Sequence, residues 1–193
     1  MRSWTSVFFV FCTVLTTTLS CDWLSKRFGH LSGLSLDLIQ DMGGPLTKKP
    51  SPVPFPYRLY SRMRKAQVDS QLVFIRDSLD LISRLYQNDK LTSVTWNKKK
   101  LEEFQGIINR QAEELNKCVS ADWQAEGQET DKLQETTENL LQKTESSSAA
   151  SWELIRKETK DHLAQLDVMV NFIKASGAAS RRRHTATEQH SSN

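Results

Sequence analysis

Residues 43–56 read Gly-Gly-Pro-Leu-Thr-Lys-Lys-Pro-Ser-Pro-Val-Pro-Phe-Pro and contain all five prolines of the 193-residue chain. Proline has no backbone N–H to give to a helix, so this stretch predicts a long, semi-extended loop. Gly43 and Gly44 predict the end of a preceding helix, because a C-cap glycine accepts the left-handed conformation and Pro45 cannot continue the helix. The architecture then depends on what flanks this loop.

Apolar residues recur at helical spacing on both sides of the loop. They predict a first helix over 24–42, a second from near Ser61 to Gln87, and a third from Ser93 or Thr95 to Cys118. A more polar segment, 123–145, is interpreted as a peripheral fourth helix, and a fifth follows Ser148. The expected core positions are Leu24, Phe28, Leu31, Leu34 or Ser35, Leu38 and Met42; Val68, Leu72, Ile75, Leu79, Ile82 and Tyr86; Leu101, Phe104, Ile108, Ala112 and Leu115; Leu133, Leu140 and Leu141; and Trp152, Ile155, Thr159, Leu163, Leu166, Val170 and Ile173.

These segments predict an all-α fold, because none shows the sustained alternation of a strand. Short connections favour antiparallel neighbours, whereas a loop of about twenty residues lets the first two helices run parallel. The prediction is an up-up-down-down bundle of five helices in residues 21–174. Residues 175–193 have a composition that cannot bury a core, so they predict a disordered basic tail.

The N-terminus has the pattern of a cleavable secretory signal, 1–20. Arg2 precedes an apolar run over 7–15, and small polar residues follow up to Ser20. A transmembrane anchor is the alternative, but the run is well short of the ~20 residues that span a bilayer. A bacterial lipoprotein signal fits less well, because Thr18 stands where it needs an apolar residue. The signal predicts a secreted, extracellular chain that begins at Cys21.

Cleavage after Ser20 removes Cys12 and leaves two cysteines. In an oxidising compartment Cys21 and Cys118 have only each other, so they predict one disulfide bond. Two free or intermolecular thiols are the alternative. The predicted topology agrees with the bond, because it places the start of the first helix and the end of the third at the same end of the bundle.

The charge distribution argues against nucleic-acid binding. The formal net charge is +3, and the basic excess lies outside residues 21–174, which are balanced. The run 98–100 of three lysines is interpreted as a solvent face, with a receptor contact as the alternative. Arg181, Arg182 and Arg183 are interpreted as a solvated tail, with polyanion binding or proteolytic trimming as alternatives. Four tryptophans near helix starts are interpreted as packing at the bundle end rather than as binding anchors: Trp23, Trp96, Trp123 and Trp152.

The sequence offers no constellation for catalysis, metal binding or a cofactor. The histidines are scattered, and none stands at ligand spacing with a cysteine or aspartate. His30 and His162 are interpreted as ordinary helix-surface residues. There is no glycine-rich phosphate loop, no nucleophile elbow and no spare cysteine after cleavage. The adjacent acids 102–103 and 113–114 are interpreted as solvated faces. An enzyme is therefore not expected.

The start of the fifth helix, Ser-Trp-Glu-Leu-Ile-Arg-Lys-Glu-Thr-Lys over 151–160, resembles the last helix of type I interferons. Further motifs fit the same family in the same order: Cys21-Asp22, Leu38-Ile39-Gln40-Asp41-Met42, Phe55-Pro56, Ser93-Val94-Thr95-Trp96 and Cys118-Val119. The chain is most similar to the two-cysteine fish members. It departs from mammalian alpha-type members at Ala150, where they carry a cysteine of a second disulfide.

This resemblance implies a monomeric antiviral cytokine that bridges two different class II cytokine receptor chains and starts JAK–STAT signalling. Arg156 matches a receptor-binding arginine of the family, and Lys48 matches a basic loop position. Pro50 stands where the family has a second loop arginine, so Lys49 is the nearest substitute. Lys157 and Lys160 follow on the same helix and complete the expected receptor-binding set.

Two alternatives remain open from the residues. Arg156 at this spacing could instead pair with Glu153 on a solvated face. The chain as a whole could be a secreted amphipathic lipid-binding or membrane-active protein, although no stable membrane insertion is expected.

Overall fold

The computed structural model describes residues 21–87, 91, 93–119, 131–132, 134–135, 138 and 148–190, with 178–190 as backbone only. Every regular element in these residues is helical. In chain order the elements are η1 (Leu24–Phe28), α2 (Gly29–Asp41), α3 (Tyr57–Met63), α4 (Val68–Tyr86), α5 (Lys98–Cys118) and α7 (Ala149–His190). The π-helical turn η1 runs directly into α2, so the two together form the first predicted helix.

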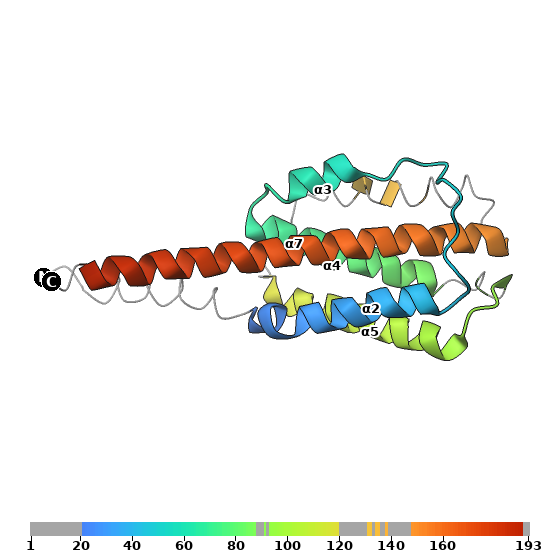
Figure 1. The fold of residues 1–193 in the computed structure, drawn as a ribbon, viewed down its shortest axis with the longest axis horizontal. Helices are drawn as coiled ribbons and strands as arrows, with labels where there is room; N and C mark the ends of the chain where they lie inside the picture. The colour runs from blue at the N-terminus through green and yellow to red at the C-terminus, as the bar shows by residue number, and fades with distance from the viewer. Residues whose placement is uncertain are drawn as a thin grey trace, which may run out of the picture.

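The four long helices α2, α4, α5 and α7 lie side by side as a bundle (Figure 1). Lys100 at the start of α5 donates its Nζ to Asp41 O at the end of α2, at 3.2 Å. Gln105 of α5 donates its Nε2 to Tyr86 O at the end of α4, at 2.5 Å. Both α2 and α4 are therefore antiparallel to α5 and parallel to each other. Since α7 also starts beside the end of α2, the predicted up-up-down-down order is confirmed.

The loop 43–56 is the crossover that makes the first two helices parallel. It leaves the end of α2, passes α7 and reaches α3 on the other side (Figure 1). Phe55 packs against His162 of α7 on the way, with 4.6 Å between ring centroids. The loop is therefore in contact with the last helix and does not extend freely into solvent.

The second predicted helix is two helices in the structure. A turn over 64–67 separates α3 from α4, so the prediction of one helix from near Ser61 is wrong. Gln71 of α4 donates its Nε2 to Ala66 O at 2.8 Å, and this bond satisfies a carbonyl that the break leaves without a helical partner. Val68, a predicted core residue, is 46% exposed, because it is the first residue of α4.

The buried face of α2 differs from the predicted one. Ser32, Ser35 and Ile39 are buried, whereas Leu31 and Leu38 are half-buried and Leu34 is exposed. Of the predicted alternatives Leu34 and Ser35, the serine is therefore the core residue. Because α2 packs against both α5 and α7, small side chains on its inner face let those helices approach closely.

The predicted cores of α5 and α7 agree with the structure, except that Leu101 in the first turn of α5 is half-buried. Phe104, Ile108 and Leu115 of α5 are fully buried, and all seven predicted positions of α7 are buried. Asn97 caps α5, because its Oδ1 accepts a hydrogen bond from Lys100 N at 3.1 Å. The third helix therefore starts at Lys98, later than Ser93 or Thr95.

The predicted disulfide is present. Cys21 is bonded to Cys118, with 4.9 Å between their Cα atoms and a sequence separation of 97. The bond joins Cys21, three residues before the start of η1, to the last residue of α5. It lies at the end of the bundle opposite to the loop 43–56 (Figure 1).

The structure describes only a few residues of the predicted fourth helix. The apolar anchors of the fourth helix and Trp123 lie outside the described residues, while the five described positions within 131–138 are helical and exposed. The helix α7 has its last residue at His190, beyond residue 174, where the predicted body ends (Figure 1). Alanine and arginine, frequent after residue 174, are strong helix formers, and this local preference suits a continued helix. The tail boundary itself stays a prediction.

Candidate functional site

Side chains from two other helices cap the C-terminal end of α2. The last carbonyl groups of a helix have no partner within it. Arg156 of α7 donates its Nη1 to Ile39 O at 3.2 Å and to Gln40 O at 2.8 Å, and Lys100 of α5 bonds to Asp41 O. Positive charge at this position is also stabilised by the helix dipole. The end of α2 is thereby tied to the starts of α5 and α7.

This capping replaces the glycine cap expected from the sequence. The C-cap residue Met42 has right-handed dihedral angles, with φ −68°, and neither Gly43 nor Gly44 has a φ in the left-handed region. The expectation of a left-handed glycine is therefore wrong. The carbonyls it would have satisfied are bonded by Arg156 and Lys100 instead.

The guanidinium of Arg156 uses all its donors within the protein. It has five N–H groups. Besides the two bonds to α2, Nη2 donates to Gly44 O at 2.5 Å and to Glu153 Oε2 at 2.6 Å, and Nε donates to Glu153 Oε2 at 3.0 Å. The residue is 0% exposed. The guanidinium is thus enclosed by its own chain, and the receptor-binding role of Arg156 stays a prediction. The pairing with Glu153 is present; the Arg156 side chain in it is fully buried, and the Glu153 side chain is 29% exposed.

Glu153, Trp96 and Gly43 complete the surroundings of the guanidinium. Trp96 Nε1 donates to Glu153 Oε1 at 2.5 Å, so both carboxylate oxygens are occupied. The Trp96 ring centroid is 5.9 Å from Arg156 Cζ. A Cβ atom on Gly43 would lie 2.7 Å from Trp96 Cδ1 and 3.2 Å from Arg156 Cζ. Only glycine fits there without displacing a neighbour. We call Gly43, Trp96, Glu153 and Arg156 the capping cluster.

The tryptophans support the interpretation as packing residues. Trp96 and Trp152 are buried and meet edge to face, with 6.3 Å between centroids. Tyr86 stacks beside Trp96 at 6.1 Å. Trp23 is half-buried and packs on Phe28 at the other end of the bundle. These aromatic contacts hold the chain before α5 against the first turns of α7.

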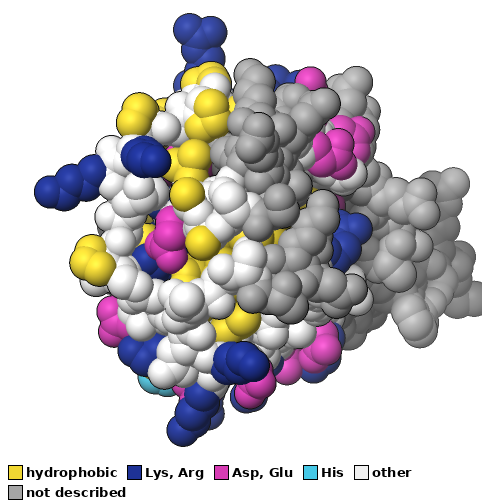
Figure 2. Space-filling model, turned by 90° about the vertical axis from the view of Figure 1, so that its right-hand side faces the viewer, with side chains coloured by type: hydrophobic (Ala, Val, Ile, Leu, Met, Phe, Trp, Pro, Cys, Tyr) yellow, Lys and Arg dark blue, Asp and Glu magenta, His cyan; other side chains and the backbone are white. Residues whose placement is uncertain are grey.

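The four predicted receptor-binding lysines lie on the two segments that meet at the capping cluster, the loop 43–56 and α7. Lys48 and Lys49 are exposed on the loop, whereas Lys157 and Lys160 are half-buried on α7. Lys160 donates its Nζ to Gln40 Oε1 at 2.6 Å. Figure 2 shows this end of the bundle, with Lys and Arg side chains standing out along its edge and hydrophobic side chains between them.

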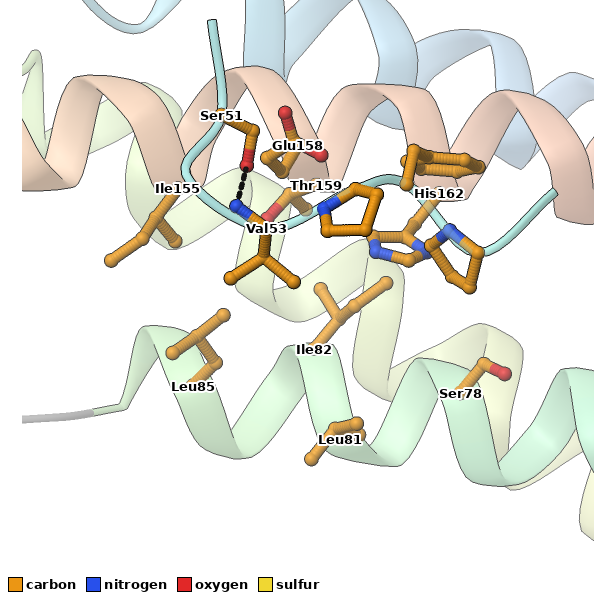
Figure 3. Close-up of a pocket in the computed structure, with 13 residues that line it drawn as sticks. Ser51, Val53, Ser78, Leu81, Ile82, Leu85, Ile155, Glu158, Thr159 and His162 are labelled. Carbon is orange, nitrogen blue, oxygen red and sulfur yellow. Dashed lines mark hydrogen bonds between the residues drawn. The ribbon is translucent and has the colours of Figure 1, made fainter. Parts of the chain in front are cut away.

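Beyond the lysines, the loop rests on α4 and α7 over a small cavity of about 30 Å³ (Figure 3). Its walls are largely apolar. Ser51 and Val53 come from the loop, Ile82 from α4, and Glu158 and His162 from α7. Ser51 Oγ accepts a hydrogen bond from Val53 N at 3.3 Å, which bends the loop locally. This packing holds the second part of the loop.

His162 is not the ordinary surface residue expected from the sequence. Its Nδ1 lies 2.6 Å from the Tyr60 hydroxyl, and the Phe55 ring covers it. Burial lowers the pKa of His162 to about 4, so the ring is neutral at physiological pH. Burial raises the pKa of Tyr60 and of Glu158. His30 is exposed as expected. The contacts of His162 with Tyr60 and Phe55 anchor the loop on α7.

Neither a cluster of metal-binding side chains nor a membrane-spanning helix occurs in the described residues. Within that part of the chain, no three His, Cys, Asp or Glu side chains are grouped closely enough to hold a metal ion. Its helices also include none with the length and apolar character needed to cross a membrane.

Comparison with known proteins identifies the family. The family model of the interferon alpha/beta domain matches residues 27–172. The chain belongs to the type I interferon family. This interferon is 37% identical over 169 residues to interferon a3 of Oncorhynchus mykiss, an alignment that covers 88% of this chain and 95% of the trout protein.

Solved structures agree with this assignment. Zebrafish interferon 1 superposes on this interferon with a TM-score of 0.69 at 32% identity, covering 79% of this chain and 99% of the zebrafish chain. Zebrafish interferon 2 has a TM-score of 0.58 at 21% identity, covers 72% of this chain and 96% of its own, and shows the fold alone. The predicted resemblance to fish type I interferons is therefore confirmed.

Membership of this family makes the protein a secreted cytokine of a class that is not enzymatic. The apolar faces of the described helices form one core. The sequence did not reveal the capping cluster. The spacing of Glu153 and Arg156 places them one turn apart on a helix, and this was the available signal. Nothing local showed that the end of α2 would cover them.

Proposed function

We propose that this interferon binds two different class II cytokine receptor chains and thereby starts JAK–STAT signalling towards an antiviral state. The observation that supports it most directly is the arrangement of one fixed face. The capping cluster joins the end of α2, the loop 43–56 and the first turns of α7, and we call this surface the loop face. Exposed lysines lie on the loop between two fixed points, the bond of Gly44 O to Arg156 and the packing of Phe55 on His162.

On this proposal, one receptor chain binds the loop face through Lys48, Lys49, Lys157 and Lys160. Exposed lysines provide long-range attraction and orientation towards an acidic partner surface. Arg156 contributes to receptor binding by holding the loop and the end of α2 together. The second receptor chain binds elsewhere on the bundle. The secreted form starts at Cys21 after removal of residues 1–20, and its body is 21–174.

The test uses purified protein starting at Cys21, with the disulfide formed, and the immobilised ectodomains of candidate class II receptor chains. We expect saturable binding to two different chains and induction of antiviral genes in cells that carry both. A folded sample that binds no pair of chains and induces no gene would contradict the proposal.

A charge reversal on the loop tests whether the loop face binds a receptor chain. Lys48→Glu should weaken binding to one receptor chain and leave the other unchanged. Lys65→Glu is the matched control, because Lys65 is exposed in the turn after α3, at the opposite end of the bundle. Equal loss from both substitutions would show that overall charge, and not the loop face, determines binding.

A further inference from the structure

We propose that Arg156 is a positioning residue for receptor binding, which fixes the loop that carries Lys48 and Lys49 without touching the receptor itself. The inference rests on the proposed function for its biological meaning. Its structural part, that Arg156 holds the start of the loop in place, stands on the geometry alone.

The first step is that one side chain holds both the helix end and the loop start. Arg156 Nη1 bonds to Gln40 O in the last turn of α2, and Nη2 bonds to Gly44 O at the beginning of the loop. These two carbonyls lie on either side of the point where the chain leaves the helix. The guanidinium is planar and rigid, so it fixes their relative position and with it the direction in which the loop departs.

The second step is that the guanidinium is itself held on its other sides. Glu153 accepts from Nε and Nη2, and the second oxygen of this carboxylate accepts from Trp96 Nε1. Trp96 is buried, and the chain after it is bonded to α2, since Asn97 N donates to Met42 O at 2.7 Å. Arg156 therefore has no alternative position while these groups stay in place.

The third step concerns where the lysines lie between the two anchors of the loop. At one side the Gly44 carbonyl is held by Arg156, and at the other Phe55 packs against His162 and Tyr60. The lysines at 48 and 49 lie between these anchors. Loss of the first anchor frees the lysine-bearing half of the loop while leaving the second anchor intact.

Lysine cannot replace arginine in this role. A lysine ammonium is a single point with three donors, whereas the guanidinium places five donors in a fixed fork. An ammonium group cannot reach the α2 carbonyls, Gly44 O and Glu153 together. Arg156→Lys keeps the charge, so it separates an effect of geometry from an effect of charge.

The experiment is a double-mutant cycle on receptor affinity. Arg156→Lys is measured in the wild-type background and in Lys48→Ala/Lys49→Ala, at a temperature where all variants are folded. We expect Arg156→Lys to weaken binding about tenfold in the wild type, the order expected when a charged hydrogen bond is lost. In the background without the lysines, most of this effect should disappear.

Two controls separate positioning from simple loss of stability. Ile108→Val removes a methyl group from the fully buried core of α5, away from the loop, and should lower stability without changing receptor affinity. Amide hydrogen exchange at residues 43–49 should accelerate in Arg156→Lys, while exchange in the middle of α4 and α5 stays unchanged.

The outcomes distinguish this inference from the proposed function. If the wild type binds no receptor chain, the proposed function fails, and the exchange measurement still tests whether Arg156 fixes the loop. If binding occurs but Arg156→Lys has the same effect in both backgrounds, or if Ile108→Val weakens binding equally, the positioning role is wrong. Unchanged exchange at 43–49 would also overturn it.

Discussion

At Gly43 the main chain passes so close to the Trp96 indole that a single added carbon would overlap it. A helix end usually uses glycine for its left-handed conformation. Here glycine is needed for its lack of a side chain, because Trp96 must reach Glu153 across it. Arg156, which caps α2 together with Lys100, is supplied from α7, and the glycine leaves space for its guanidinium.

Gly43→Ala is therefore expected to destabilise the protein by about 1–3 kcal/mol, the usual cost of overpacking a tight contact. Gly44→Ala is the control, since nothing lies within 4 Å of a Cβ at that position. Denaturant unfolding followed by circular dichroism measures both. Similar losses for the two variants would show that the close approach to Trp96 is not the cause.

His162 gives a pH dependence with a definite sign. Its pKa is about 4 in the folded protein, below the ordinary value of 6.5, so the unfolded chain binds the proton more readily. The stability that comes from the neutral ring is therefore complete above about pH 6.5 and is lost as the pH falls towards 4. Glu158 works in the opposite direction, because its pKa is raised and protonation favours the folded state.

The comparison of wild type with His162→Gln isolates the histidine, because Glu158 and the other acids are common to both. We expect the free energy of unfolding of the wild type to fall relative to His162→Gln between pH 7 and pH 4. Unfolding curves at several pH values test this. Parallel pH profiles would mean that burial of His162 does not perturb its titration.

At the level of helices, the success of sequence reasoning depended on how each helix is packed. In α7 the large apolar residues repeat at helical spacing, and every predicted core position is buried. In α2 four leucines compete for the inner face, and the two neighbouring helices select Ser32 and Ser35 instead. Close helix approach is a tertiary effect and leaves no periodic signal.

The candidate site, like the helices, could be predicted only in part from the sequence. The lysines on the loop and α7 could be located from sequence, and Arg156 could be paired with Glu153 by spacing. Its burial could not be predicted, because it depends on the end of α2, more than a hundred residues away in sequence. The separate helix α3 was missed because apolar spacing continues through the turn over 64–67.

Exposed glycines inside helices allow a stabilising substitution. At Gly33 in α2 and Gly106 in α5, an added Cβ atom would have no neighbour within 4 Å, and neither residue has a positive φ. Gly33→Ala and Gly106→Ala should each raise the free energy of unfolding by about 0.5–1 kcal/mol, because alanine loses less conformational freedom in a helix. Thermal unfolding of each variant provides the measurement, and a lowered midpoint in either would contradict the prediction.

At the level of the whole molecule, the bundle is closed by different means at its two ends. The loop end is held by hydrogen bonds and aromatic packing, whereas the opposite end is held by the Cys21–Cys118 disulfide. A disulfide between residues so far apart in sequence greatly restricts the unfolded chain. It also fixes the start of the first helix beside the end of α5, as the up-up-down-down order requires.

Removal of this bond by Cys21→Ser/Cys118→Ser should lower the free energy of unfolding by about 4–5 kcal/mol on the chain-entropy model. Guanidinium unfolding of the oxidised wild type and of the double variant gives the difference. Reductant should move the wild type towards the variant and leave the variant unchanged. Identical midpoints for all samples would show that the bond contributes nothing to stability.

The separation of the two ends also determines how the protein can be attached to a surface. Cys21 lies at the end of the bundle away from Lys48 and Lys49. An affinity tag or fluorophore placed ahead of Cys21 should therefore leave the loop face free, and sensor chips loaded through such a tag should present every molecule with its lysines towards the solution.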